Sequence, residues 1–147
     1  MTNDDTHKDC VFCQPRLTGE ITRAGPCVIV DARETLFPGF TRVIWHDHVR
    51  EMTDLTSEQR QDFMAVVFDV EQIMRATLKP HKVNLASLGN QTPHLHWHVI
   101  PRFEDDVAFP GPVWVSGIDS VAAEHRRAQT TSTLADYHEA LIQHFTA

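Results

Sequence analysis

The chain of 147 residues has the length of one ordinary globular domain and is short for two domains with separate hydrophobic cores. Its 13 lysine and arginine residues against 20 aspartate and glutamate residues give a formal net charge of −7. This balance disfavours binding to nucleic acid or to an anionic membrane through a broad basic surface. We therefore expect one domain over residues 1–147, with at most a small local anion site.

The N-terminal segment MTNDDTHKDC is polar and acidic and lacks the apolar region of a signal peptide. The sequence also contains no run of about 18 apolar residues that could cross a bilayer. We therefore expect a cytoplasmic protein. Three cysteines are an odd number, and two of them are spaced as Cys10-Val11-Phe12-Cys13. In a reducing compartment this argues against a disulfide framework and leaves a metal site open.

Two strands are predicted in the first third of the chain. Residues 27–30 (CVIV) form a β-rich run that ends at Asp31, and residues 41–45 (TRVIW) read as a second strand. The Pro38-Gly39 turn signal lies between them, so we expect an antiparallel pair.

A long helix is predicted from Ser57 to Leu78. Thr56 or Ser57 can cap it, because a hydroxyl there accepts from the N–H groups of the first turn, and Pro80 stops it. Apolar residues repeat at three- and four-residue spacing along one face: Phe63, Val66, Val67, Val70, Ile73, Met74, Thr77 and Leu78. This pattern predicts that the helix lies on a sheet.

The second half of the chain predicts two more strands and a helical tail. Residues 82–90 (KVNLASLGN) and 94–103 (HLHWHVIPRF) read as strands, and residues 104–112 as a loop. Arg102 is expected to form a surface ion pair. Helical signals return at residues 120–127 and 132–145. The order of elements favours an α+β fold with an antiparallel sheet.

The segment HLHWHVI places His94, His96 and His98 at alternate positions. Alternate side chains of a strand share a face, so these three would point one way and Leu95 and Trp97 the other. The outer two would lie about 13 Å apart, which is too far to share one zinc ion. The pattern suits nucleophilic chemistry better, with one imidazole attacking, a neighbour assisting the leaving group and the third orienting the set.

These residues resemble the signature of the histidine triad (HIT) superfamily of nucleotide hydrolases and transferases, His-φ-His-φ-His-φ-φ. The segments PGF…RVIW, HVREMTDLT, VNLASLGN and IPRF also resemble it. The similarity covers a core of about residues 10–103; the extension over about residues 104–147 loosely resembles diadenosine-polyphosphate-hydrolase-like bacterial members. It implies a five-stranded antiparallel sheet, a long central helix, additional C-terminal helices and a homodimer.

The resemblance also implies roles for individual residues. His96 would attack the α-phosphorus of a purine nucleotide derivative, such as a dinucleoside polyphosphate, and water would resolve the nucleotidyl-histidine intermediate. His98 would contact the phosphate and the leaving group, and His94 would orient the site. Asp31 would bind the ribose hydroxyls, and Asn84 would help to hold the phosphate.

The family commonly has Gly-Gln-Ser/Thr before the triad, and here Gly89, Asn90 and Gln91 occupy these positions. A glutamine amide can donate to a phosphate oxygen, but it cannot protonate an amine as a serine hydroxyl can. This difference weakens the prediction of phosphoramidase activity more than the prediction of polyphosphate hydrolase activity. A Gly turn that leads into a strand can supply backbone N–H groups to an anion without a cluster of lysines. We expect that the chemistry requires no cofactor.

Cys10 and Cys13 have the spacing of half a zinc site. Some family members that this chain resembles have such a pair, completed by a histidine after the second strand and by the first triad histidine. These positions are His48, with His46 as the competing choice, and His94. A Cys2His2 zinc would be structural, because it leaves no open coordination position. The alternative is two free thiols in a loop.

Other functions stay open from the sequence. A nucleoside phosphoramidase and a non-catalytic nucleotide-binding adaptor would share the fold. A metal-dependent barrel enzyme of the cupin kind also uses His-x-His on a strand, but the nearest following glutamate, Glu104, is too distant in sequence. Trp97 is expected in the core, and Trp114 is the better candidate for contact with substrate or a dimer partner.

Overall fold

The computed structural model describes residues 7–147; residues 1–6, part of the polar N-terminal segment, lie outside the described residues. Within residues 7–147, one antiparallel sheet has the strand order β1-β2-β3-β5-β4. The elements are β1 (Glu20–Ala24), β2 (Cys27–Asp31), β3 (Thr41–Trp45), the 3-10 helix η2 (Met52–Asp54), α1 (Ser57–Leu78), β4 (Lys82–Ala86), β5 (His96–Arg102) and α2 (Val121–Thr146). The predicted α+β fold with a five-stranded antiparallel sheet is confirmed.

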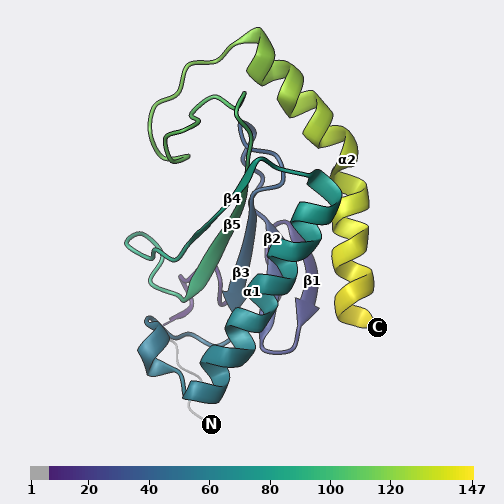
Figure 1. Cartoon of the computed structure of the whole chain (residues 1–147). Coiled ribbons are helices and arrows are strands. Elements are labelled where there is room, and N and C mark those ends of the chain that lie inside the picture. Colours follow the sequence, from purple (N-terminus) through teal and green to yellow (C-terminus); the bar gives the residue numbers. More distant parts are fainter. Residues whose placement is uncertain (1–6) are drawn as a thin grey trace.

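The register of the strands divides the sheet into two faces. Ile44 pairs with His96 and Val43 with Trp97, and paired residues share a face because side chains alternate along each strand. We call the side of Ile44 and His96 the histidine face, and the side of Val43 and Trp97 the helix face. Helices α1 and α2 pack side by side over the helix face (Figure 1). The histidine face is therefore not covered by these two helices.

Helix α1 begins and ends where the sequence predicts. The Thr56 hydroxyl accepts from the backbone N–H of Gln59 at 3.1 Å, and the Gln59 side-chain oxygen accepts from the backbone N–H of Thr56 at 2.9 Å. This reciprocal cap satisfies donors of the first turn. Lys79, with φ 51°, ends the helix in the left-handed region before Pro80. The buried residues of the helix lie on the predicted face: Phe63, Val67, Val70, Met74 and Leu78.

Strand β1 was not predicted from the residue pattern. Its sequence, EITRA, carries two charged residues in five positions, which conceals the alternation of a strand. These charges pair with each other, since Arg23 Nη2 donates to Glu20 Oε1 at 2.9 Å. Gly25, with φ 55°, then makes the tight turn into β2, where a residue with a Cβ would be strained.

The two predicted C-terminal helical segments are one continuous helix, α2. The expected break fell on a polar stretch rich in threonine and serine. Instead, the Thr130 hydroxyl donates to the Arg126 carbonyl at 3.1 Å, and the Thr133 hydroxyl donates to the Thr130 carbonyl at 2.9 Å. The hydroxyls therefore bond to the preceding turn, and the helix continues through this stretch.

Arg102, expected in a surface ion pair, is only 2% exposed. Its guanidinium donates to both carboxylate oxygens of Asp106, at 2.9 and 3.0 Å, and to the Gly111 carbonyl at 2.7 Å. It also donates to Asn84 Oδ1 at 2.9 Å. The surface prediction was wrong because residues 104–112 fold back over the end of β5 and enclose the guanidinium. Arg102 thus fixes this loop to the sheet.

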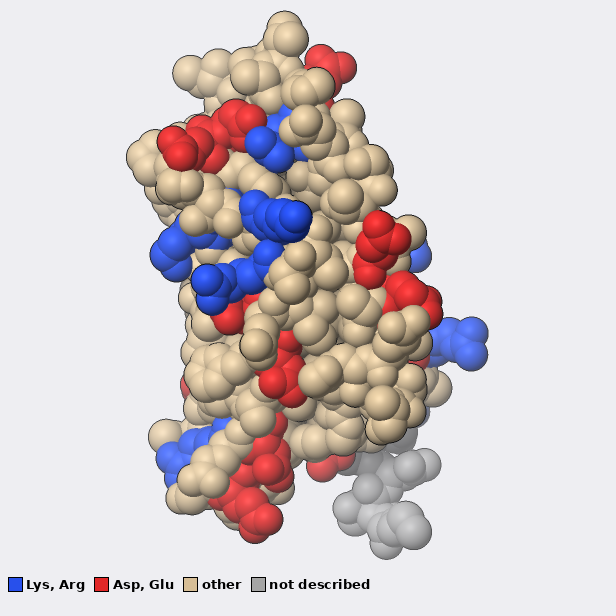
Figure 2. Space-filling model, turned by 45° about the vertical axis from the view of Figure 1, so that its right-hand side comes forward, with Lys and Arg blue, Asp and Glu red and all other residues tan. Residues whose placement is uncertain are grey.

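Charges are mixed on the face shown in Figure 2, where basic side chains lie in small groups between acidic ones. Of the helices formed by residues 7–147, none combines the length and apolar character that a bilayer span requires.

Replacing Arg102 with methionine is expected to lower the free energy of unfolding by about 3 kcal/mol, because the Asp106 carboxylate stays buried without its partner. Urea denaturation followed by circular dichroism measures the change. Arg127→Met is the matched control: Arg127 makes a similar two-point contact with Asp119, but the aspartate is 58% exposed, and no measurable change is expected. Equal effects of the two substitutions would contradict this account of Arg102.

Candidate active site

His96 is the first residue of β5 and is buried on the histidine face. Its Nδ1 lies 2.6 Å from the carbonyl oxygen of His94. A carbonyl oxygen can only accept, so Nδ1 carries the proton and the lone pair of a neutral ring is on Nε2. Burial lowers the pKa of His96, and the charge of Arg42 adds to this shift against the opposing effect of the hydrogen bond. His96 is therefore a neutral imidazole with a free nucleophilic nitrogen at neutral pH.

His98 follows on the same face, with its ring centroid 5.0 Å from that of His96 and the ring planes perpendicular. Burial lowers the pKa of His98 to about 4, and the charges of His96 and Arg42 contribute. Its Nδ1 is buried and has no hydrogen-bond partner within the described part of the chain. A neutral ring with the proton on Nε2 avoids leaving a buried N–H donor unsatisfied.

His94 differs from the other two histidines because it lies before the start of β5. The alternation expected for three strand residues therefore holds for His96 and His98 alone. The His94 ring is anchored by its Nε2, which donates to the Trp45 carbonyl at 2.6 Å. Its Nδ1 points to two thiols, 3.5 Å from Cys10 Sγ and 3.4 Å from Cys13 Sγ.

Cys10, Cys13, His48 and His94 form a cluster in which the four donor atoms all lie within 4.8 Å of one another. Cys13 Sγ is 3.2 Å from His48 Nδ1. In a tetrahedral zinc site, bonds of about 2.3 Å to sulfur and 2.0 Å to nitrogen place the donors roughly 3.3 to 3.8 Å apart. The donor set and its spacing therefore fit a metal ion. The competing residue His46 is outside the cluster, exposed and paired with Asp47.

A cavity of about 500 Å³ opens over the histidine face. Phe12 covers one side, with its ring 5.0 Å from His96, and half-exposed Trp114 stands 5.8 Å from His98. The cavity is lined by residues from six parts of the chain: Val11, Phe12, Glu34, Arg42, Leu88, Gly89, Asn90, Gln91, Thr92, His96, His98 and Trp114.

The structure brings the predicted loop residues Gly89, Asn90 and Gln91 to the cavity that holds His96. Gly89 has φ 140°, a backbone conformation that residues with a Cβ rarely adopt. Thr92 also lines the cavity, so a residue with a hydroxyl stands beside Gln91, the residue expected at the family's hydroxyl position.

Arg42 and Glu34 were not identified from the sequence, yet both line the cavity. The segment TRVIW reads as a mostly apolar strand, and its one charged residue gave no sign of a function. The register supplies the missing information, because Arg42 pairs with His98 and therefore shares the histidine face.

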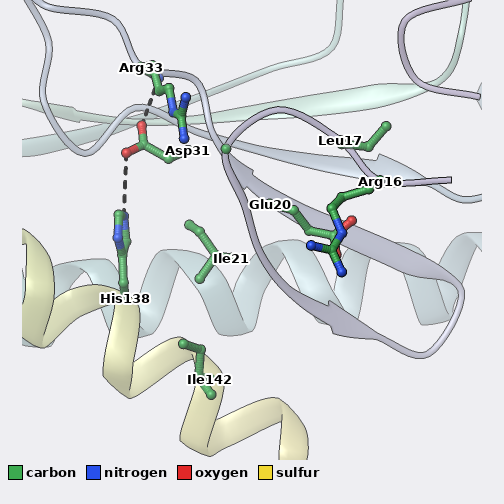
Figure 3. Close-up of a pocket in the computed structure, with 9 residues that line it drawn as sticks. Arg16, Leu17, Glu20, Ile21, Asp31, Arg33, His138 and Ile142 are labelled. Atoms are coloured by element: carbon green, nitrogen blue, oxygen red, sulfur yellow. Dashed lines mark hydrogen bonds and ion pairs between the residues drawn. The ribbon is translucent and has the colours of Figure 1, made fainter. Parts of the chain in front are cut away.

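Asp31, the residue expected on the ribose, lies on the other side of the sheet. It pairs with Thr41 on the helix face and lines a separate pocket beside α2. Figure 3 shows its carboxylate between Arg33, whose backbone N–H donates at 2.7 Å, and His138, whose Nε2 lies 3.8 Å away. This position gives no support to the ribose prediction. Glu34 is the acidic residue that lines the cavity.

Asn84 lies on the histidine face, because it pairs with Ile100. Its side-chain oxygen accepts from Arg102, and the residues that line the His96 cavity do not include it. The buried amide has the partner that its position requires, and a contact with phosphate stays a prediction.

Trp97 packs against the core on the helix face, as the alternation predicts, and its indole N–H contacts Met52 Sδ at 3.5 Å. Trp114 lines the cavity, which agrees with its selection as the tryptophan nearer to a ligand.

A family model for the HIT domain matches residues 21–105, more than half of the chain. Among solved structures, a histidine triad protein from Marinobacter aquaeolei VT8 is 26% identical, with a TM-score of 0.65 over 83% of this chain and 89% of the other. A HIT family protein from Bacillus anthracis str. 'Ames Ancestor' is 25% identical, with a TM-score of 0.61 over 88% and 96% of the two chains.

Among curated proteins, an AP-4-A phosphorylase from Mycobacterium tuberculosis (strain ATCC 25618 / H37Rv) is 30% identical over 78 residues. The match covers 49% of this chain and 40% of the relative, so the chain spans about two-fifths of the length of that protein.

Proposed function

Because the chain belongs to the HIT domain family, we propose that it is a nucleotide hydrolase or transferase whose nucleophile is His96. The observation that carries this proposal is the 2.6 Å hydrogen bond from His96 Nδ1 to the His94 carbonyl. It keeps the proton on Nδ1 and leaves the Nε2 lone pair of a cavity-lining residue free to attack.

The reaction would have two steps. His96 Nε2 forms a bond to the α-phosphorus of a purine nucleotide derivative, and the bond from that phosphorus to the bridging oxygen of the leaving group breaks. In the second step a water molecule or another acceptor attacks the same phosphorus, and the bond to Nε2 breaks. The nucleotide leaves as a monophosphate when water is the acceptor, and the imidazole returns to its starting state.

The surrounding groups suit a phosphate at this position. His98 can donate from Nε2 to a phosphate or bridging oxygen, since its neutral ring keeps a proton there. Residues 89–92 offer the side chains of Asn90, Gln91 and Thr92 and the backbone of a turn. Donors held in place around the developing charge are the usual means of stabilising such a transition state.

A dinucleoside polyphosphate is the substrate that we favour. The curated relative is named for AP-4-A, and 30% identity over 49% of this chain supports the same class of substrate here. Because that relative is named a phosphorylase, inorganic phosphate is tested beside water as the second acceptor.

His96→Ala is expected to lower kcat for release of AMP or ADP from diadenosine tetraphosphate by at least about a thousand-fold, because the nucleophile is lost. Chromatographic quantification of the products measures the rate. His81→Ala is the control: His81 is exposed and pairs with Glu104, and its replacement is expected to leave the rate unchanged. Undiminished turnover by the His96 variant would disprove its role as nucleophile.

We also propose that Cys10, Cys13, His48 and His94 hold a structural zinc ion. The compact Cys2His2 donor set supports this. So does the hydrogen bond from His94 Nε2 to the Trp45 carbonyl, because histidines that bind a metal through one ring nitrogen commonly donate the other N–H to a carbonyl. Bound there, zinc would join the N-terminal segment to His48, which follows β3, and to His94, which lies two residues before the start of β5. All four donors would be protein atoms, so the ion would supply stability and no reactive water.

The purified protein is therefore expected to contain about one zinc ion per chain. His48→Ala is expected to lose the metal and to lower the melting temperature, whereas His46→Ala should keep both, because His46 stands outside the cluster. Plasma mass spectrometry and thermal denaturation give the two readouts. Full zinc content in the His48 variant would refute this ligand set.

A homodimer completes the proposal, and the free edge of β4 supports it. β4 is an edge strand of the sheet, so the backbone N–H and C=O groups of its outer edge can pair with a strand of a partner. Two large apolar residues are exposed, Leu85 on β4 (38%) and Phe68 on α1 (54%).

Light scattering coupled to size exclusion is expected to give twice the 16.7 kDa of one chain. Leu85→Lys should shift the mass toward the monomer, because a charge would enter the apolar contact. Val121→Lys serves as control, since Val121 is exposed at the start of α2. A monomeric parent protein at micromolar concentration would reject the dimer.

A further inference from the structure

Arg42 lies beside the catalytic histidines without an assigned role. It is the β3 partner of His98 and lines the cavity that holds His96. Its charge reaches both rings, since it contributes to the lowered pKa of each histidine. Burial lowers the pKa of Arg42 itself, and Glu34 opposes the shift. A guanidinium nevertheless stays protonated at neutral pH.

The guanidinium of Arg42 has no hydrogen-bond acceptor among residues 7–147; its described contact is with the Phe40 ring, 5.6 Å from the guanidinium carbon. Glu34 lines the same cavity but forms no ion pair with it in the described part of the chain. Arg102, also on the histidine face, instead uses its donors on Asp106, Asn84 and Gly111. The five N–H donors of this half-buried side chain are therefore available to an anion that enters the cavity.

The place of Arg42 separates it from the groups that would hold the reacting phosphate. β5 lies between β3 and β4, so Arg42 approaches the two histidines from the β3 side. The connection from β4 to β5, which carries Asn90, Gln91 and Thr92, starts from the strand on the opposite side of β5 and lines the same cavity. A phosphate at His96 can use that connection and His98 as donors and leave Arg42 available for another group.

We propose that Arg42 forms an anion subsite that binds a second phosphate group of the substrate, distinct from the phosphate that His96 attacks. A guanidinium suits this task because its planar donors engage two phosphate oxygens at once. The inference rests on the proposed function and narrows its substrate to nucleotides with at least two phosphate groups. The second phosphate comes either from the polyphosphate chain or from a phosphorylated ribose.

Isothermal titration of the His96→Ala protein, which prevents turnover, separates these two sources. AMP carries one phosphate, ADP adds the second on the chain, and adenosine 3′,5′-bisphosphate adds it on the ribose. We expect ADP or the bisphosphate to bind at least about ten-fold more tightly than AMP, in line with one charge-assisted hydrogen-bonded contact. The ligand that gains identifies the source of the phosphate.

Adding Arg42→Leu to the His96→Ala protein is expected to abolish the gain in affinity of ADP or the bisphosphate over AMP. The affinity for AMP itself should stay within about two-fold. Arg50→Leu removes the same charge from an exposed loop residue that does not line the cavity, and should preserve the gain. If Arg42→Leu fails to fold by circular dichroism, Arg42→Gln replaces it, keeping a long polar side chain without the charge.

Two results would overturn the subsite: AMP, ADP and the bisphosphate binding equally, or a gain that persists without Arg42. If no nucleotide binds, the proposed function fails, and inorganic pyrophosphate then decides the subsite alone. Binding of pyrophosphate that disappears in the Arg42 variant would support the anion site, and unchanged or absent binding would reject it.

Discussion

The hydrogen bond from His96 Nδ1 to the His94 carbonyl is the contact on which the candidate active site depends. It selects the tautomer of His96, and its geometry is set by how His94 is held. The His94 ring is fixed by the Trp45 carbonyl on one side and faces Cys10 and Cys13 on the other. The backbone of one residue therefore connects the cysteine–histidine cluster to His96, so a well-ordered cluster would help to fix the position of the His96 ring.

The main core and the candidate active site lie on opposite faces of the sheet. The helix face is covered by α1 and α2 and holds the main core, including fully buried Val43 and Tyr137. The rigid sheet then presents His96 and His98 on its other face, where the N-terminal segment, the connection before β5 and the segment with Trp114 enclose the cavity. Arg102 stabilises this arrangement at the far end of β5 by holding residues 104–112. Side chains on a strand are positioned more firmly than side chains on loops, which suits a nucleophile.

Local patterns in the sequence predicted what depends on periodicity. The three- and four-residue spacing gave the buried face of α1, and a capping hydroxyl and Pro80 gave its two ends. Alternation placed His96 and His98 together. Register and loop path carry no such local signal. For this reason Arg42 was missed and Arg102 was expected at the surface. Asp31 lies on the helix face and does not line the cavity, and its role on the ribose stays a prediction. The grouping of the cysteine pair with two distant histidines came from family resemblance and not from spacing.

The central claim is that His96 carries the nucleotide during the reaction. Its most direct test is intact-mass spectrometry of protein quenched in acid-free denaturant during turnover of diadenosine tetraphosphate, followed by peptide mapping. The account predicts a protein heavier by one AMP group, with the adduct on the peptide that contains His96. An adduct on another residue, or product formation with no adduct under conditions that preserve phosphoramidate bonds, would contradict it.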